Sequence, residues 1–268
     1  MPEKINVALV DLEFGSTFTK IYLRHPDVEP LTICHANPQR LAQHQEKFGV
    51  VKAVATLEEV FADATIDATH LNSGIPDHTR QAIANLEAGK HVACTIPMAT
   101  SLDDIRHHRL ERDEPLAMEI TRALFHSARG YEESFTIYGE DATFEAPQLE
   151  GEAPVLFRLS APGAHSGPRR STFERLYVPD YGNRLPEEIR SFTGAVEIDG
   201  RGEHPSVMHC GGHGGSHPHT VHEFMRSIIE ERTPSCDEIA GANWTAPGIC
   251  AHGSSMSDGK EVTILSFN

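Results

Sequence analysis

Residues 69–105 read THLNSGIPDHTRQAIANLEAGKHVACTIPMATSLDDI and decide the fold of this chain. An apolar run ends in a Pro/Gly turn, and a helix with small and apolar residues on one face follows. Gly89 and Lys90 close that helix, and a second apolar run stops at Pro97. This order of strand, turn, helix, strand and turn is typical of a parallel sheet, which binds its ligand at the turns after the strands. The last turn, Thr-Ile-Pro, holds no group that could move a proton.

The same alternation of strands and helices extends toward the N-terminus. Apolar, β-rich runs predict strands at 5–10, 30–34, 50–55, 66–71 and 91–95. Helix starts between them are signalled by Gly15 with Ser16, by Asn37 as a cap, by a capping box of Thr56 with Glu59, and by Asp77 in a first turn. Alternating elements at this spacing predict a parallel α/β sheet in the strand order 3-2-1-4-5, with right-handed crossovers.

The pattern changes after Asp104. A charged segment at 106–115 is a candidate linker, which divides the chain into predicted domains at 1–105 and 106–268. Apolar residues then alternate with period two at 117–125, 133–138, 142–145 and 155–159, with a hairpin signal at 139–141. Helices are expected at about 221–231 and 237–252, and a last strand at 261–265. The predicted second domain is therefore a smaller α+β unit with an antiparallel sheet.

Composition narrows the class of partner. The formal net charge is −16, from 23 Lys plus Arg against 39 Asp plus Glu, which opposes binding to nucleic acid and to anionic lipid. The five cysteines form no C-x-x-C pair and are odd in number, which favours a reducing cytoplasm over a disulfide framework. The N-terminal apolar run is too short for a signal peptide or a membrane span, so a cytoplasmic location is expected.

Several segments share a pattern with a known family. They lie at 7–15, 33–40, 72–78 and 88–97, and further on as RGYEESFTIYGEDATFE at 129–145, VPDYGNRLPEEIRSFT at 178–193 and GGHGGSHPHTVHEF at 211–224. Together they resemble the Gfo/Idh/MocA oxidoreductases, the glucose–fructose oxidoreductase and inositol dehydrogenase family. The resemblance implies a Rossmann-like N-terminal domain, NAD or NADP as cofactor, a small sugar or polyol substrate, an open antiparallel sheet and a homo-oligomer.

The glycine-rich turn of that family falls on 11–15, and two of its glycines are replaced by Asp11 and Glu13. A glycine there lets the backbone approach the pyrophosphate, whose negative charge a helix N-terminus favours. The acids add bulk and like charge, so weak cofactor binding is expected.

Two further positions depart from the family. His35 stands where an acid commonly holds the ribose after the second strand, which leaves Asn37 and Arg40 as nearby polar groups, a pattern more tolerant of a 2′-phosphate. Ile96 stands where the family has a lysine that contacts nicotinamide ribose and substrate. The resemblance implies cofactor contacts at Leu12, Glu13, Phe14, Gly15, His35, Asn37, Arg40, Asn72, Ser73, His78, Thr95 and Pro97.

The family's catalytic histidine has no clear counterpart. In the family, the fifth strand is followed by another helix and strand and then by a segment with a D-x-x-x-H type motif. Here only a dozen residues separate Asp104 from Ala117, and from Ala117 onward the sequence already resembles the family's C-terminal sheet. Roughly a hundred family residues are absent, judged by length, so the chain resembles an internally shortened and functionally impaired homologue.

A histidine-rich tract is the sharpest isolated signal. His213, His217, His219 and His222 lie close together and are followed by Glu223. His and carboxylate at short spacing can ligate Zn²⁺, but the spacing is not H-E-x-x-H, and a wall of a sugar pocket or loop packing is favoured over a metal site. His78, His213, His217 and His219 are the candidates for a catalytic base.

Three functions remain open from the sequence. The first is a Gfo/Idh/MocA-type NAD(P)-dependent oxidoreductase acting on a sugar or polyol hydroxyl. The second is a non-catalytic scaffold or binding protein derived from that family, which the lost glycines favour. The third is a metal-dependent hydrolase that uses the histidine tract, which stoichiometric metal in the purified protein would favour.

Overall fold

The structure is a computed structural model that describes residues 4–102, 134–147, 152–160, 170–177, 181–193 and 215–267. The chain divides into two compact units, of which the first comprises Met1–Ile120 with Tyr181–Asn268 and the second Thr121–Asp180. The predicted boundary between residues 105 and 106 and the predicted strand at 117–125 lie outside the described residues. The division into domains 1–105 and 106–268 therefore stays a prediction.

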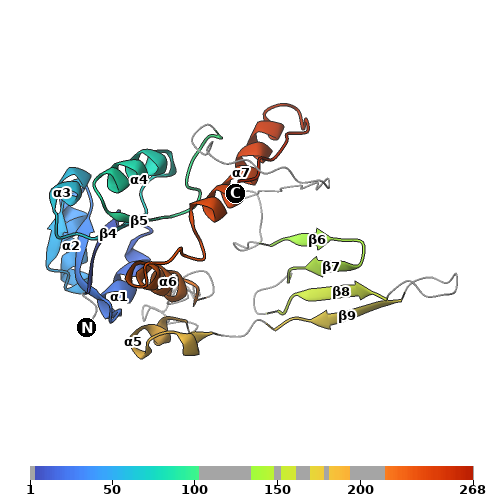
Figure 1. Cartoon of the computed structure of the whole chain (residues 1–268), viewed down its shortest axis with the longest axis horizontal. Coiled ribbons are helices and arrows are strands. Elements are labelled where there is room, and N and C mark those ends of the chain that lie inside the picture. The colour runs from blue at the N-terminus through green and yellow to red at the C-terminus, as the bar shows by residue number, and fades with distance from the viewer. Residues whose placement is uncertain are drawn as a thin grey trace, which may run out of the picture. The chain divides into compact units, whose positions relative to one another are not determined.

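The first unit contains a five-stranded parallel sheet (Figure 1). Its strands are β1 (Ile5–Val10), β2 (Val28–Cys34), β3 (Lys52–Val54), β4 (Ala68–Leu71) and β5 (His91–Cys94). They lie in the order β3-β2-β1-β4-β5, and every neighbouring pair is parallel. The predicted strand order is confirmed, and β1 occupies the centre because residues 6–10 are buried on both faces.

The helices begin at the predicted caps. They are α1 (Ser16–Arg24), α2 (Pro38–Phe48), α3 (Leu57–Ala62), the 3-10 turn η1 (Ile75–Asp77) and α4 (His78–Glu87). The Asn37 side chain accepts from the backbone N–H groups of residues 39 and 40, and the capping box of Thr56 and Glu59 is formed. Asp77 lies in η1 and directly precedes α4, so the acid stands at the helix start as predicted.

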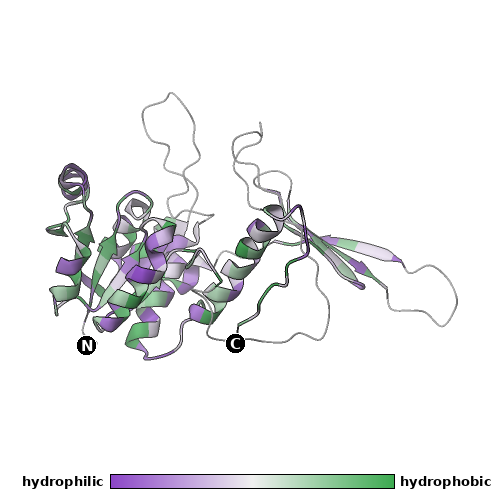
Figure 2. Ribbon diagram, turned by 90° about the horizontal axis from the view of Figure 1, so that it is seen from above, coloured by the Kyte–Doolittle hydropathy of each residue, from purple (hydrophilic) through white to green (hydrophobic). Residues whose placement is uncertain are grey.

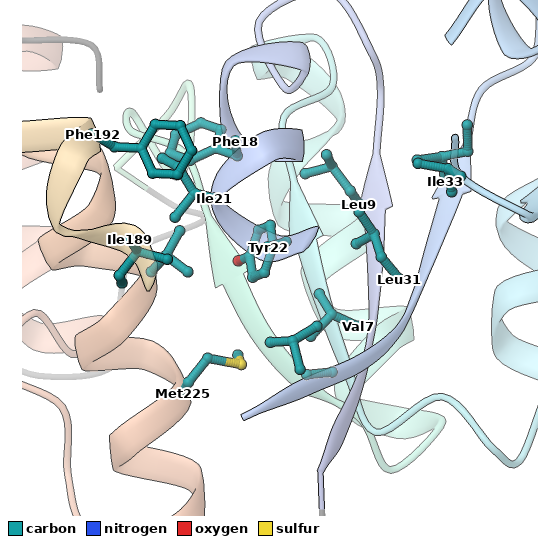
Figure 3. Close-up of a cluster of buried hydrophobic side chains, with 14 of the residues drawn as sticks. Val7, Leu9, Phe18, Ile21, Tyr22, Leu31, Ile33, Ile189, Phe192 and Met225 are labelled. Atoms are coloured by element: carbon teal, nitrogen blue, oxygen red, sulfur yellow. The ribbon is translucent and has the colours of Figure 1, made fainter. Parts of the chain in front are cut away.

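Helices from late in the sequence complete the core of this unit. These are η3 (Gly182–Arg184), α5 (Glu187–Arg190), η4 (Ser191–Thr193) and α6 (His217–Ile229). Helix α1 packs against the sheet on one side and against α5 and α6 on the other. Figure 3 shows the side chains that meet there, which include Val7, Leu9, Phe18, Ile21, Tyr22, Leu31, Ile33, Ile189, Phe192 and Met225. Burial of this apolar surface is the main force that holds α6 on α1.

The C-terminal segment corrects one expectation. Helix α7 (Glu238–Ser255) is present as predicted, but the predicted strand at 261–265 is wrong, because those residues form no strand and only the adjacent Ser266 forms an isolated β-bridge. Beyond this segment, the Asn243 side chain accepts from the backbone N–H of Phe267 and donates to its carbonyl oxygen, each at 2.8 Å. This largely apolar stretch (Figure 2) packs against α7 through Leu265 and Phe267.

The second unit is a four-stranded antiparallel sheet in the order β6-β7-β8-β9. Its strands are β6 (Thr136–Tyr138), β7 (Ala142–Glu145), β8 (Val155–Leu159) and β9 (Ser171–Arg175). The predicted hairpin at 139–141 joins β6 and β7. The sequence did not predict β9, whose residues are all exposed and show no apolar alternation. The chain is thus a mixed α/β protein, with a Rossmann-like sheet and a separate antiparallel sheet, as expected.

Candidate functional site

The loops that follow β1, β2, β4 and β5 lie at the same edge of the sheet, because parallel strands present their carboxyl ends together. They comprise residues 11–15, 35–37, 72–77 and 95–97. All of the residues implied by the family resemblance as cofactor contacts fall in these loops or in the helix turns that follow them. This edge is the candidate functional site.

The turn after β1 requires a glycine at its end. A Cβ atom on Gly15 would lie 2.1 Å from the carbonyl oxygen of Asp11, which is far inside contact distance. Asp11 adopts a left-handed backbone conformation with φ of 67°, and its carboxylate accepts from the backbone N–H of Glu13 at 2.9 Å. Leu12 is buried beneath the turn, and Phe14 is partly exposed. The turn is therefore tight and fixed, with an acid in the conformation that a glycine adopts most easily.

An ion pair joins the first two loops. Arg40 Nη2 lies 2.9 Å from Glu13 Oε1, and their side chains are 50% and 65% exposed. On the second loop, His35 Nδ1 accepts from the backbone N–H of Asn37 at 2.9 Å, while the Asn37 side chain caps α2. Two residues from different candidate loops are thus brought together, and the carboxylate of the pair comes from the turn after β1.

The loops after β4 and β5 are tied to each other by buried polar groups. Asn72 is buried, its Oδ1 accepts from Thr95 Oγ1 at 2.9 Å, and its Nδ2 donates to the carbonyl oxygen of His70. The same Nδ2 would lie 3.3 Å from a Cβ on Gly15. The Ser73 hydroxyl donates to the side chain of Gln81. These groups satisfy one another and fix the edge between β1, β4 and β5.

His78 serves as a clamp in this half of the edge. Its side chain is buried, with Nε2 2.7 Å from the carbonyl oxygen of Ser73 and Nδ1 2.9 Å from that of Pro97. A neutral imidazole carries one N–H, so the neutral ring can donate to one of these oxygens at a time. Both ring nitrogens face the backbone, and the adjacent Ile96 side chain is 58% exposed. His78 therefore fastens the loop after β4 to the end of β5.

The described histidines of the tract do not converge on one point. His217 is buried and stacks on Phe18 with ring centroids 4.2 Å apart, and His219 on the same helix is half-buried. His222 Nδ1 lies 3.0 Å from His25 Nε2. Glu223 accepts from the Arg232 guanidinium and from Ser235, which holds the pKa of that carboxyl down at about 2.

His213 lies outside the described residues. In the part of the chain that the structure describes, no group of three or more His, Cys, Asp or Glu side chains could hold a metal ion. No helix there is long and apolar enough to cross a membrane.

Several buried polar groups in the first unit were not predicted from the sequence. Tyr22 donates to or accepts from His70 Nδ1 at 3.0 Å, beneath α1. Burial raises the pKa of Tyr22 and, with the nearby His217, lowers the pKa of His70 to about 3. Lys90 is buried and donates to the carbonyl oxygens of Asp63 and Ile66 at 2.9 Å each. A polar residue inside an apolar run is the signal that could have identified His70, whereas Lys90 lies in the turn between a helix and a strand.

Strand order, loop positions and the glycine-dependent turn together define a Rossmann-type fold. Residues 5–114 match the Gfo/Idh/MocA sequence family, described as an oxidoreductase family with an NAD-binding Rossmann fold. Over these residues, the chain is similar to the Gfo/Idh/MocA family.

Two curated relatives match part of the chain. A 1,5-anhydro-D-fructose reductase from Ensifer adhaerens is 32% identical over 78 residues, which is 29% of this chain and 23% of that protein. A myo-inositol 2-dehydrogenase from Thermotoga maritima is 34% identical over 73 residues, which is 27% of this chain and 22% of that protein. The chain thus spans less than a quarter of the length of each of these relatives.

Among solved structures, the apo form of a levoglucosan dehydrogenase superposes with a TM-score of 0.65 at 13% identity. The superposition covers 99% of this chain and 100% of that chain. At this identity the likeness shows the fold alone, and it includes both the parallel and the antiparallel sheet.

Proposed function

We propose that this chain binds NAD(P) at the carboxyl edge of its parallel sheet, as an oxidoreductase of sugar or polyol hydroxyls whose turnover is impaired. The observation that carries the proposal is the turn after β1. A Cβ on Gly15 would lie 2.1 Å from the carbonyl oxygen of Asp11, so the turn keeps the close strand-to-helix approach that a dinucleotide requires. The family match over residues 5–114 supports the same cofactor.

The residues at this edge fit the cofactor in shape and oppose it in charge. The backbone of 12–15 and the first turn of α1 would hold the pyrophosphate, as helix N-termini do for anions. His35, Asn37 and Arg40 would face the adenosine ribose, and the loop 72–78 with Thr95 and Pro97 would run along the rest of the dinucleotide. Asp11 and Glu13 place two carboxylates beside the phosphates, so the expected binding is weak.

When bound, NAD(P)⁺ would supply the hydride acceptor, and the protein would have to supply the base. His78 is poorly suited to that role, because both of its ring nitrogens face backbone carbonyl oxygens. Among the described residues of the tract, His217 is stacked on Phe18, which leaves His219 as the more accessible imidazole. Ile96 cannot replace the family lysine. Loss of a positioned base alone costs roughly 10²–10⁴-fold in rate, so little or no turnover is expected.

A binding or assembly function derived from the family is the second candidate, and one observation favours it. Large apolar side chains of the second unit are exposed, namely Phe135, Ile137, Tyr138, Phe173 and Tyr177. An exposed apolar sheet of this kind suits a homo-oligomer. The described cysteines, Cys34, Cys94, Cys236 and Cys250, are free thiols, which is consistent with the proposed reducing cytoplasm.

Titration of the protein with NADH and NADPH, followed by nicotinamide fluorescence, tests the proposed site. Weak but saturable binding is expected, and competition by ADP-ribose distinguishes the dinucleotide site from nonspecific quenching. Absence of saturable binding by either cofactor would contradict the proposal and favour the binding or assembly function.

A panel of inositols, aldoses and anhydrosugars with NAD⁺ and NADP⁺, read at the NAD(P)H absorbance band, tests turnover. Turnover at about one per second or faster would contradict the proposed impairment. If His217→Ala or His219→Ala then abolished it, the replacement base would be identified.

A further inference from the structure

The Glu13–Arg40 ion pair links two loops that would face different parts of a dinucleotide. Among the ion pairs of the described residues, it alone joins the turn after β1 to the first turn of α2. In Rossmann-type domains, an acid after the second strand binds the ribose 2′-hydroxyl of NAD, whereas a nearby arginine accommodates the 2′-phosphate of NADP. Arg40 stands at the second of these places, and it is already paired.

Both partners project from fixed backbone. The Glu13 N–H donates to the Asp11 carboxylate and the Glu13 carbonyl accepts from Ser16 Oγ, each at 2.9 Å. The Arg40 N–H donates to the Asn37 side chain at 3.3 Å, in the capped first turn of α2. The two side chains therefore meet because the turn and the cap bring their backbones together, although both side chains remain open to solvent.

The loop after β2 offers no carboxylate of its own. His35 occupies the usual position of the acid, and its Nδ1 already accepts from the Asn37 N–H. The charge that decides how the ribose end is recognised therefore comes from the turn after β1, through Glu13. A 2′-phosphate carries about −1.5 to −2 charges near neutral pH. To reach the Arg40 guanidinium, it would have to compete with the Glu13 carboxylate for the N–H donors or lie beside that negative charge.

We propose that Glu13 sets the cofactor class of this site, by holding Arg40 and so excluding the 2′-phosphate of NADP in favour of NAD. The inference rests on the proposed dinucleotide site. His35, Asn37 and Arg40 alone would suggest a site that tolerates the 2′-phosphate of NADP. With Glu13 paired to Arg40, we expect the site to discriminate against that phosphate. Glu13→Gln removes the competing charge, keeps the size of the side chain and leaves Arg40 available to the phosphate.

Two nucleotide fragments isolate this effect. Adenosine 5′-monophosphate and adenosine 2′,5′-bisphosphate differ only in the 2′-phosphate, and isothermal titration calorimetry measures both without any turnover. The wild-type protein is expected to bind the bisphosphate no more tightly than the monophosphate. In E13Q, the affinity ratio should shift toward the bisphosphate by at least about fivefold, near the upper end of what an exposed charge pair contributes.

Two further variants supply the controls. Glu46→Gln removes an equal charge from an exposed position later on α2 and should leave the ratio unchanged. E13Q combined with Arg40→Gln should lose the gain, because the phosphate then has no guanidinium to bind. Thermal unfolding of every variant should stay within about 2 °C of wild type, since the pair is exposed.

The outcomes separate this inference from the proposed function. A wild-type preference for the bisphosphate of about fivefold or more, or an equal gain for both fragments in E13Q, would overturn the role of Glu13 while the site stands. The same shift in E46Q would assign the effect to overall charge. If neither fragment nor NADH nor NADPH binds to any variant, the proposed function fails and this inference fails with it.

Discussion

The two halves of the carboxyl edge differ in what their side chains do. In the turn after β1 and the first turn of α2, the charged groups of Glu13 and Arg40 are at least half exposed and form an ion pair with each other. In the loops after β4 and β5, the polar side chains of Asn72 and His78 are buried and bonded to neighbouring loops or backbone. The difference shows that position at the ligand edge does not by itself make a residue available to a ligand.

The physical reason lies in burial. A buried polar group must be satisfied within the protein, so the second half of the edge is committed to holding the loops in place. An exposed ion pair contributes little to stability and can be exchanged for contacts with a ligand at small cost. Substitutions in the second half should therefore change stability, whereas substitutions in the first half should change binding.

Gly15 lies where the two halves of the edge meet. Among the substitutions considered, its replacement should have the largest effect on the free energy of unfolding. Gly15→Ala places a Cβ 2.1 Å from the Asp11 carbonyl oxygen and 3.3 Å from Asn72 Nδ2, so the turn must open. We expect a loss of at least about 2 kcal/mol in the free energy of unfolding, measured by urea denaturation. Gly248→Ala in α7 is the control, because a Cβ there meets nothing within 4 Å and alanine favours a helix. Equal stability of G15A and wild type would show that the turn is not fixed as described.

The imidazoles of His25 and His222 lie together at the C-terminal end of α1, where burial again determines what the side chains can do. His25 Nδ1 accepts from the Asp27 N–H, so its Nε2 carries the proton and donates to His222 Nδ1. Burial and the neighbouring His222 lower the pKa of His25 to about 4, and burial also lowers that of His222. The charged groups around the pair are Asp27, Glu188, Glu223, Arg226 and Glu230.

Because the folded-state pKa of His25 lies below the unfolded value, its contribution to stability is present above about pH 6.5 and is lost as the pH falls toward about 4. The full loss is roughly 3 kcal/mol for His25 alone. Urea denaturation across this range should show the decline, and His222→Gln should make it shallower. A pH-independent free energy of unfolding between these limits would contradict a neutral imidazole pair.

His78→Ala tests the clamp in the second half of the edge. The variant removes a buried ring that faces two carbonyl oxygens, so we expect the free energy of unfolding to fall by about 1–3 kcal/mol. His219→Ala removes a half-buried imidazole and should cost less than about 1 kcal/mol. If H78A and H219A lowered the free energy of unfolding by the same amount, the structural role of His78 would be contradicted. His78 would then be a stronger candidate for the catalytic base.

Arg40→Gln should have the smallest effect on stability. Loss of an exposed pair with Glu13 costs less than about 0.5 kcal/mol, which urea denaturation should barely detect. A loss comparable to that of H78A would break the distinction between the two halves of the edge.

Local signals predicted the frame of the site well. Apolar runs predicted the five parallel strands and their order, and the caps at Asn37 and Thr56 are formed. The strand predicted at 261–265 is wrong because an apolar segment can pack against a helix, here α7 through Leu265, without forming a strand. Exposed β9 lacked the alternation that marks a half-buried strand.

Local patterns could not predict the tertiary contacts that determine whether a side chain is available to a ligand or bonded within the protein. His25 and His222 are 197 positions apart, and Glu13 meets Arg40 only because two loops converge. His78 follows a turn signal that places it at the ligand edge, yet its burial depends on the separate chain segment at Pro97. Such pairings follow from tertiary packing, which no local pattern encodes.

The affinity of the Asp11→Gly/Glu13→Gly double variant for NADH tests the central claim most directly. The change removes two carboxylates from beside the phosphates and restores close backbone approach at the turn after β1. Nicotinamide fluorescence titration should show binding at least tenfold tighter than in the wild-type protein, which corresponds to about 1.4 kcal/mol. Unchanged affinity in the folded double variant would contradict the account, because the cofactor site would then lie elsewhere or be absent.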